Sequence, residues 1–154
     1  MLARRTVPVP ERSTWPASAR IVPPHPDPAP AMNAVLWILQ VLLALVFLAS
    51  GLLKLTTPRE ALVARLPVLA AYRPATVRLV GLAEVLGAVG VVVPLATGVA
   101  PGLTPWAALG LATVVVAAAL AHAEQRDYRP LALHAALLAV AVAVVYGRSA
   151  DVPV

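Results

Sequence analysis

Residues 34–53 read AVLWILQVLLALVFLASGLL, twenty positions without a charged side chain. As an α-helix this run rises about 30 Å, which is the thickness of the hydrocarbon layer of a bilayer. Backbone N–H and C=O groups in lipid must be paired within their own segment, and the run lacks the apolar–polar alternation of a strand. The sequence therefore predicts a transmembrane helix here.

Three more apolar segments follow, at residues 77–97, 105–122 and 131–147. Of all residues 60% are hydrophobic and only 12% are charged, against about 25% charged residues in ordinary soluble domains. One small core cannot hide this much apolar surface, because a small domain still exposes much of its area. We predict an all-α membrane fold: a bundle of four transmembrane helices formed by residues 32–148, followed by a short tail at 149–154.

The segment between the first two spans carries helical signals of its own. Residues 57–60, TPRE, match a capping box with Thr57 as N-cap and Pro58 at the first helical position. Three leucines then fall on one helical face: Leu62, Leu66 and Leu69. We predict a short helix that lies in the membrane interface between helices one and two and is broken near Pro67.

Prolines mark the other boundaries. Thr104 followed by Pro105 is typical of an N-cap and a first helical residue, and Pro130 starts the fourth span in the same way. Residues 1–31 hold half of the sixteen prolines and four arginines, a composition that favours an extended, solvated chain. We predict a disordered tail there, or alternatively that Met32 is the true start and the tail is not made.

Basic residues gather in two of the three loops. Loop 54–76 carries Lys54, Arg59, Arg65 and Arg73, and loop 123–130 carries Arg126 and Arg129. The loop between the second and third spans has no basic residue, and a single one, Arg148, follows the fourth span. The positive-inside rule then predicts a multi-pass plasma-membrane protein with both basic loops cytoplasmic and both termini outside.

Five ionisable side chains gather in the cytoplasmic half of the predicted bundle: Lys54, Arg78, Glu84, His122 and His134. Glu84 is the deepest, roughly 10–12 Å from the start of its span. An ionisable residue at such depth usually faces the bundle interior and is a candidate for function. Four glycines are candidates for close helix packing: Gly51, Gly81, Gly87 and Gly90. We predict an intramembrane polar pocket formed by Lys54, Glu84, His122 and His134.

Several roles for Glu84 stay open. It can pair with Lys54 or His134 to fix helix register, or remain protonated because removal from water disfavours the carboxylate, or contact a ligand. Haem between His122 and His134 is disfavoured, since single histidines are more often hydrogen-bonded packing residues. A proton-coupled small-molecule transporter is also disfavoured, because the bundle offers little aromatic surface for a cation.

Other classes are not supported by the residues. The chain has no cysteine, so it carries no dithiol, thiolate metal site or iron–sulfur cluster. We find no complete catalytic constellation, no metal-site motif and no phosphate-cradling loop. The net charge of +5 falls between apolar runs and indicates membrane topology, not a nucleic-acid partner.

Five stretches resemble the DoxX-like family of small four-helix membrane proteins. They are LVFLASGLLKL (45–55), TTPREALVARLP (56–67), VRLVGLAEVLGAVGVVVP (77–94), GLTPWAALGLA (102–112) and AVAVVYGR (141–148). The resemblance covers about residues 33–148, and its most specific parts are G-x-x-K at 51–54 and G-x-x-E-x-x-G at 81–87.

The resemblance implies a four-helix integral membrane protein and less about chemistry. Similar proteins look like membrane subunits of a thiosulfate:quinone oxidoreductase, partners in thiol and oxidant defence, cargo receptors or assembly chaperones. It implies Lys54 and Glu84 as an interior pair, whereas His134 stands where similar proteins often have an amide. Two functions stay open: an accessory subunit of a membrane redox or quinone-linked complex, or a non-catalytic membrane adaptor or assembly factor. Either would have the lipid bilayer and other membrane or peripheral proteins as partners.

Overall fold

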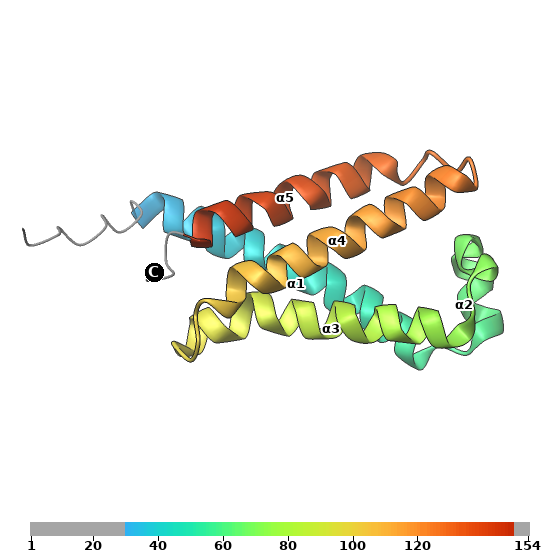
Figure 1. Ribbon diagram of the computed structural model, residues 1–154, viewed down its shortest axis with the longest axis horizontal. Helices are drawn as coiled ribbons and strands as arrows, with labels where there is room; N and C mark the ends of the chain where they lie inside the picture. The colour runs from blue at the N-terminus through green and yellow to red at the C-terminus, as the bar shows by residue number, and fades with distance from the viewer. Residues whose placement is uncertain (1–29, 150–154) are drawn as a thin grey trace, which may run out of the picture.

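The computed structural model describes residues 30–149, and the regular secondary structure of this part of the chain is all helical. Its elements are α1 (Pro30–Thr56), α2 (Arg59–Arg65), the 3-10 helix η2 (Pro67–Ala71), α3 (Pro74–Thr97), α4 (Leu103–Glu124) and α5 (Leu131–Ser149). The four long helices are each long and apolar enough to cross a bilayer. The predicted all-α membrane fold is therefore confirmed, and α2 with η2 is the predicted short helix between the first two spans (Figure 1).

The long helices contact one another in a ring, α1 on α3, α3 on α4, α4 on α5 and α5 on α1. We call the end that carries α2, η2 and the α4–α5 loop the α2 end. The start of α1, the α3–α4 loop and the end of α5 form the opposite end. Toward the α2 end, α4 and α5 draw away from α1 and α3 (Figure 1). This divergence creates the space in which the candidate site lies.

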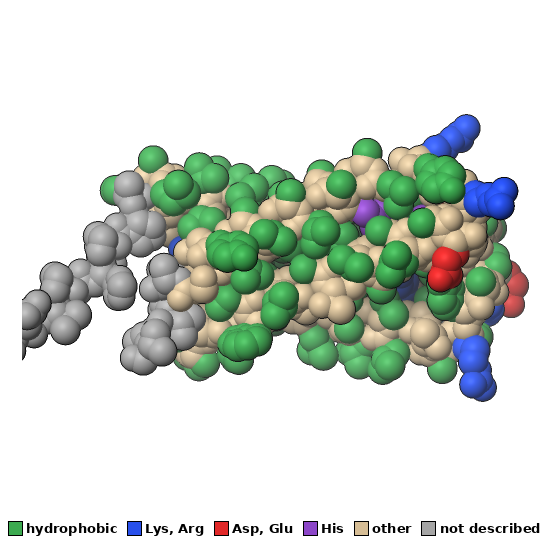
Figure 2. Space-filling view, turned by 45° about the horizontal axis from the view of Figure 1, so that its top comes forward, with side chains coloured by type: hydrophobic (Ala, Val, Ile, Leu, Met, Phe, Trp, Pro, Cys, Tyr) green, Lys and Arg blue, Asp and Glu red, His purple; other side chains and the backbone are tan. Residues whose placement is uncertain are grey.

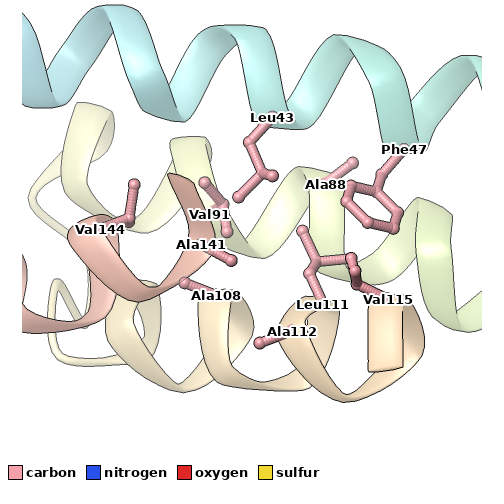
Figure 3. Packing of buried hydrophobic residues seen from close by; sticks show 10 residues of the cluster. All are labelled: Leu43, Phe47, Ala88, Val91, Ala108, Leu111, Ala112, Val115, Ala141 and Val144. Carbon is pink, nitrogen blue, oxygen red and sulfur yellow. The ribbon is translucent and has the colours of Figure 1, made fainter. Parts of the chain in front are cut away.

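The core is built mostly from small side chains. Its buried members come from all four spans: Leu43, Phe47, Ala88, Val91, Ala108, Leu111, Ala112, Val115, Ala141 and Val144 (Figure 3). Only 17–33% of each apolar span is buried, so the remaining apolar side chains cover the outside of the bundle (Figure 2). Burial inside the protein cannot account for this much apolar surface, and lipid is its solvent.

Glycines set the closest helix contacts. A Cβ added to Gly51 on α1 would lie 2.6 Å from the backbone oxygen of Gly81 on α3, so the two backbones touch there. Farther along α3, Gly87 lies against Leu111, and Gly90 lies against the Cβ of Ala107, both on α4. Gly81 thus faces α1, while Gly87 and Gly90 face α4.

The helices extend beyond the predicted spans. Helix α1 begins at Pro30 instead of residue 34 and ends at Thr56 instead of residue 53, and α3 and α4 each begin earlier than predicted. Helical backbone hydrogen bonds continue into the mixed polar and apolar residues that flank each run, which a search for uninterrupted apolar runs leaves out. Pro30 and Ala31 of the predicted tail therefore belong to α1, and the predictions for residues 1–29 and 150–154 lie outside the described residues.

Both predicted threonine caps are wrong. The N-cap of α2 is Pro58, without a side-chain cap, and that of α4 is Gly102. Thr104 instead lies inside the first turn of α4, and its Oγ1 is buried without a hydrogen-bond partner among residues 30–149. Pro130 lies just before α5, where its carbonyl oxygen accepts a hydrogen bond from the backbone N–H of His134.

Candidate functional site

Lys54 and Glu84 form an ion pair between α1 and α3. The Lys54 Nζ lies 2.8 Å from each carboxylate oxygen of Glu84, and it also donates to Ser50 Oγ at 2.6 Å. The two side chains are only 11% and 5% exposed. The three N–H donors of the ammonium group match three acceptors, so the buried charge is fully hydrogen-bonded.

Helix direction explains how these two residues meet. Cα–Cβ bonds tilt toward the N-terminus of a helix. Lys54, in the last turn of α1, therefore reaches back into the bundle, while Glu84 on the antiparallel α3 reaches toward the α2 end. The contact of Gly51 with Gly81 brings the helices close enough for the side chains to pair. Ten residues into the 24-residue α3, Glu84 lies about 15 Å from the helix start, near the middle of the helix.

Arg78 does not join this pair. Its exposed guanidinium group donates to the backbone oxygen of Leu55, one of the last carbonyl groups of α1. Carbonyl groups at a helix C-terminus have no partner within the helix, and a basic side chain is a favourable partner for them. Arg78 thus ties the α2 ends of α1 and α3 together, outside the polar pocket.

His122 and His134 meet on the other side of the bundle, at the α4–α5 hairpin. Their ring centroids are 5.3 Å apart, with the ring planes tilted by 51°. The Nδ1 of His122 lies 3.0 Å from Oδ2 of Asp127, and the Nδ1 of His134 lies 2.7 Å from the backbone oxygen of Pro130. Both imidazoles are therefore held in place through the same ring nitrogen.

A cavity of about 690 Å³ lies between the two polar walls. Ser50, Lys54 and Glu84 line one wall, and His122 and His134 line the other, so the structure brings all four predicted pocket residues around one space. Most of the remaining lining is apolar, and it includes the exposed Val46 on α1 and Leu133 on α5 at the rim. Concave sites of this size, apolar with a few converging polar groups, are typical of small-molecule sites.

The segment after α2 covers the cavity at the α2 end. Leu66, Val68 and Tyr72 contribute to its lining. Arg59 holds this segment in shape by donating to the backbone oxygen of Tyr72 at 2.9 Å. Across the cavity mouth, Gln125 Nε2 of the α4–α5 loop donates to the backbone oxygen of Val68 at 2.9 Å. Residues 66–72, which cover the cavity, are thus hydrogen-bonded both to α2 and to the α4–α5 loop.

A second polar cluster lies at the opposite end. Arg148 donates through Nε to Gln40 Oε1 at 2.6 Å and through Nη1 to Asn33 Oδ1 at 2.7 Å, and its guanidinium lies 5.3 Å from the ring centre of Trp37. Gln40 also donates to the backbone oxygen of Val91 at 2.8 Å, which links α1, α3 and α5. Placing Arg148 after the fourth span was wrong: it belongs to the last turn of α5 and is buried. The sequence signal for this cluster was Gln40, a polar residue within the apolar run 34–53, because such a residue needs a hydrogen-bond partner inside the bundle.

Comparison with known proteins identifies the family. A family model described as DoxX-like matches residues 38–144, which include both walls of the cavity and exclude Arg148. The chain belongs to the DoxX-like family. No curated protein and no solved structure matches the chain.

Charges around this DoxX-like cavity balance. The Lys54 ammonium is neutralised by the Glu84 carboxylate, and Arg65 and Asp127 add one charge of each sign to the lining. The arrangement fits an uncharged molecule that is mostly apolar and carries a few hydrogen-bonding atoms. Beside Ser50, a strongly charged headgroup would stay without compensation, because Lys54 and Glu84 already neutralise each other there.

Proposed function

We propose that this DoxX-like protein is an accessory subunit of a membrane redox complex and that its cavity binds a quinone. A quinone has an uncharged ring with carbonyl oxygens and an apolar tail, which suits a balanced and mostly apolar cavity. Because the chain has no cysteine for a dithiol or an iron–sulfur cluster, a partner subunit would carry the electrons.

The proposal rests on the cavity between two polar walls. We call them the Ser50 wall, formed by Ser50, Lys54 and Glu84, and the histidine wall, formed by His122 and His134. Ser50 Oγ accepts from Lys54, and a hydroxyl group can still donate its own hydrogen. That hydrogen would bind a ring carbonyl oxygen, while the Lys54–Glu84 pair fixes the position of Ser50. The tail would leave past Val46 and Leu133, which are exposed at the rim.

We also propose a membrane orientation for this protein. The α2 end carries the basic residues of both loops, from Arg59 to Arg73 and from Arg126 to Arg129, and Lys and Arg side chains project there (Figure 2). At the opposite end Arg148 is buried among amide side chains. We therefore place the α2 end, with the cavity, on the cytoplasmic side of the plasma membrane and both termini outside.

Purification in mild detergent with native lipid tests this proposal. We expect the protein to retain a quinone, detected by extraction and mass spectrometry, and to co-purify with a protein that carries a flavin, haem or iron–sulfur centre. Ala118→Phe should displace the quinone because Ala118 lines the cavity, whereas Ala117→Phe adds the same volume at an exposed neighbouring position. The quinone proposal fails if the intact protein retains none, or if both variants retain equal amounts.

A membrane adaptor or assembly factor is the second candidate. The observation in its favour is that the Lys54 ammonium already has three acceptors, so the pair is satisfied without a ligand. The pair also adjoins the Gly51–Gly81 contact, where it fixes the register of α1 on α3. For an adaptor, co-purification should recover a partner protein at fixed stoichiometry, and Ala118→Phe should leave that partner bound.

A further inference from the structure

The histidine pair has the hydrogen-bond pattern of metal ligands. A carbonyl oxygen can only accept, so Nδ1 of His134 carries the hydrogen that meets the Pro130 oxygen. The carboxylate of Asp127 likewise accepts from Nδ1 of His122. In a neutral imidazole the other nitrogen, Nε2, then holds a lone pair. Metal-bound histidines nearly always donate their second ring N–H to a carboxylate or a backbone carbonyl, and this pair shows one of each.

We propose that His122 and His134 bind one divalent transition-metal ion through their Nε2 atoms. With metal–nitrogen bonds of about 2.0–2.1 Å, two imidazoles that share a tetrahedral ion place their ring centroids roughly 5 Å apart. The centroids of His122 and His134 are 5.3 Å apart. Imidazole nitrogen favours zinc, copper, nickel and similar ions over magnesium or calcium.

The surroundings provide the other requirements of such a site. No group of three or more histidine or carboxylate ligands occurs within residues 30–149, so water or a small ligand would have to complete the coordination of an ion held by two histidines. The cavity provides space there for water or a small ligand. On its far wall, Lys54 is neutralised by Glu84 and repels a cation little. The ion can enter from water past Asp127, whose side chain is 48% exposed, and the His122 side chain beside it is 16% exposed.

The sequence alone does not predict this site. His122 and His134 belong to different helices and lie on either side of the α4–α5 turn, so they form no short ligand motif. The turn brings the last residues of α4 beside the first residues of α5, and the two hydrogen bonds then orient the rings. The inference does not depend on the quinone proposal, because the Ser50 wall is separate from the two imidazoles.

Titration of the detergent-purified, untagged full chain with Co²⁺ tests the proposal. We expect a visible absorption band that saturates at one Co²⁺ per chain and is displaced by Zn²⁺. All measurements use a His25→Ala background, so that the third histidine of the chain cannot contribute. His122→Asn and His134→Asn should each abolish the band. The asparagine amide can still donate to the Asp127 or Pro130 oxygen, so the hairpin keeps its hydrogen bonds while Nε2 is lost.

Leu133→Ala is the matched control, since it changes the same cavity wall at a position without a ligand atom. It should keep the band at one Co²⁺ per chain. Thermal unfolding of each variant without metal shows whether the fold persists. If an asparagine variant does not fold, a Zn²⁺-dependent change in the His122 and His134 ring NMR signals of the background protein replaces it. The proposal is overturned if the band does not saturate, if either asparagine variant retains it, or if Zn²⁺ leaves those signals unchanged.

Discussion

The Lys54–Glu84 pair permits a quantitative prediction about stability. Lys54→Met leaves a carboxylate that is only 5% exposed without its cation, and Glu84→Met leaves an ammonium that is 11% exposed without its anion. Because both groups are far below one-third exposure, the values for buried pairs apply. We expect each single substitution to lower the free energy of unfolding by about 3–5 kcal/mol. Lys54→Met should cost toward the upper end, since it also removes the donor to Ser50.

The double variant separates the energy of the Lys54–Glu84 interaction from the energies of each residue's contacts with its surroundings. Replacing both residues by methionine leaves no buried charge and fills a similar volume, so we expect stability within roughly 1 kcal/mol of the original protein. The two single losses then exceed the loss of the double variant by about 5 kcal/mol or more, a pairwise coupling energy above the range usual for neighbouring residues. Ser50→Ala, which removes one acceptor from the same ammonium, should cost about 1–2 kcal/mol.

Reversible unfolding in mixed detergent micelles, followed by circular dichroism, measures the original protein and all four variants under one condition. Single variants that each lose less than about 1 kcal/mol would show that water or lipid headgroups reach the pair, contrary to its burial. A double variant that loses the sum of the two single losses would show that the residues do not act as a pair. Either result refutes the reasoning from geometry.

Three further predictions concern packing and the cavity cover. Gly51→Ala should lower the free energy of unfolding by about 1–3 kcal/mol in the same assay, because the added Cβ meets the backbone of α3. The control Gly110→Ala, with nothing within 4 Å of the added Cβ, should leave stability unchanged or raise it by up to about 1 kcal/mol. Equal effects of the two substitutions would contradict the close contact at Gly51. Gln40→Leu should lower the free energy of unfolding by about 2–3 kcal/mol, since it removes buried hydrogen bonds to α3 and α5. A loss below about 0.5 kcal/mol, typical of a surface site, would argue against a stabilising role for these hydrogen bonds. Gln125→Ala should speed amide hydrogen exchange in residues 68–71 and leave exchange in the four spans unchanged, because it removes one hydrogen bond between η2 and the α4–α5 loop. Unchanged exchange in 68–71 would show that this hydrogen bond is dispensable.

Apolar composition was enough to predict the four spans. Runs such as 34–53 have one physical solution in lipid, an internally hydrogen-bonded helix. The position of Glu84 well inside α3 also followed from counting along its helix, because rise per residue is constant. The prediction that Lys54 contacts Glu84 needed one more assumption, that the first two spans are antiparallel neighbours. The structure places them so, with Gly51 on Gly81 at the contact.

Features that depend on tertiary geometry were not predictable in this way. The burial of Arg148 arises from amide groups far away in the sequence, Gln40 and Asn33, so position at a helix end was misleading. The cavity arises because α4 and α5 diverge from α1 and α3, and no composition signals that divergence. The caps failed for a related reason, since the turn geometry at Pro58 and Gly102 decided where the helices begin.

The cavity lies at one end of the bundle, and this position has a consequence for supply. The two leaflets of a bilayer are separate reservoirs, and a molecule with a polar head exchanges between them slowly. A molecule that enters past Val46 and Leu133, as proposed above, would come from the leaflet at the α2 end, because the Gln40–Arg148 cluster fills the bundle interior at the other end. Occupancy of the site would then follow the composition of a single leaflet, so a compound delivered to the opposite face must flip across before it can bind.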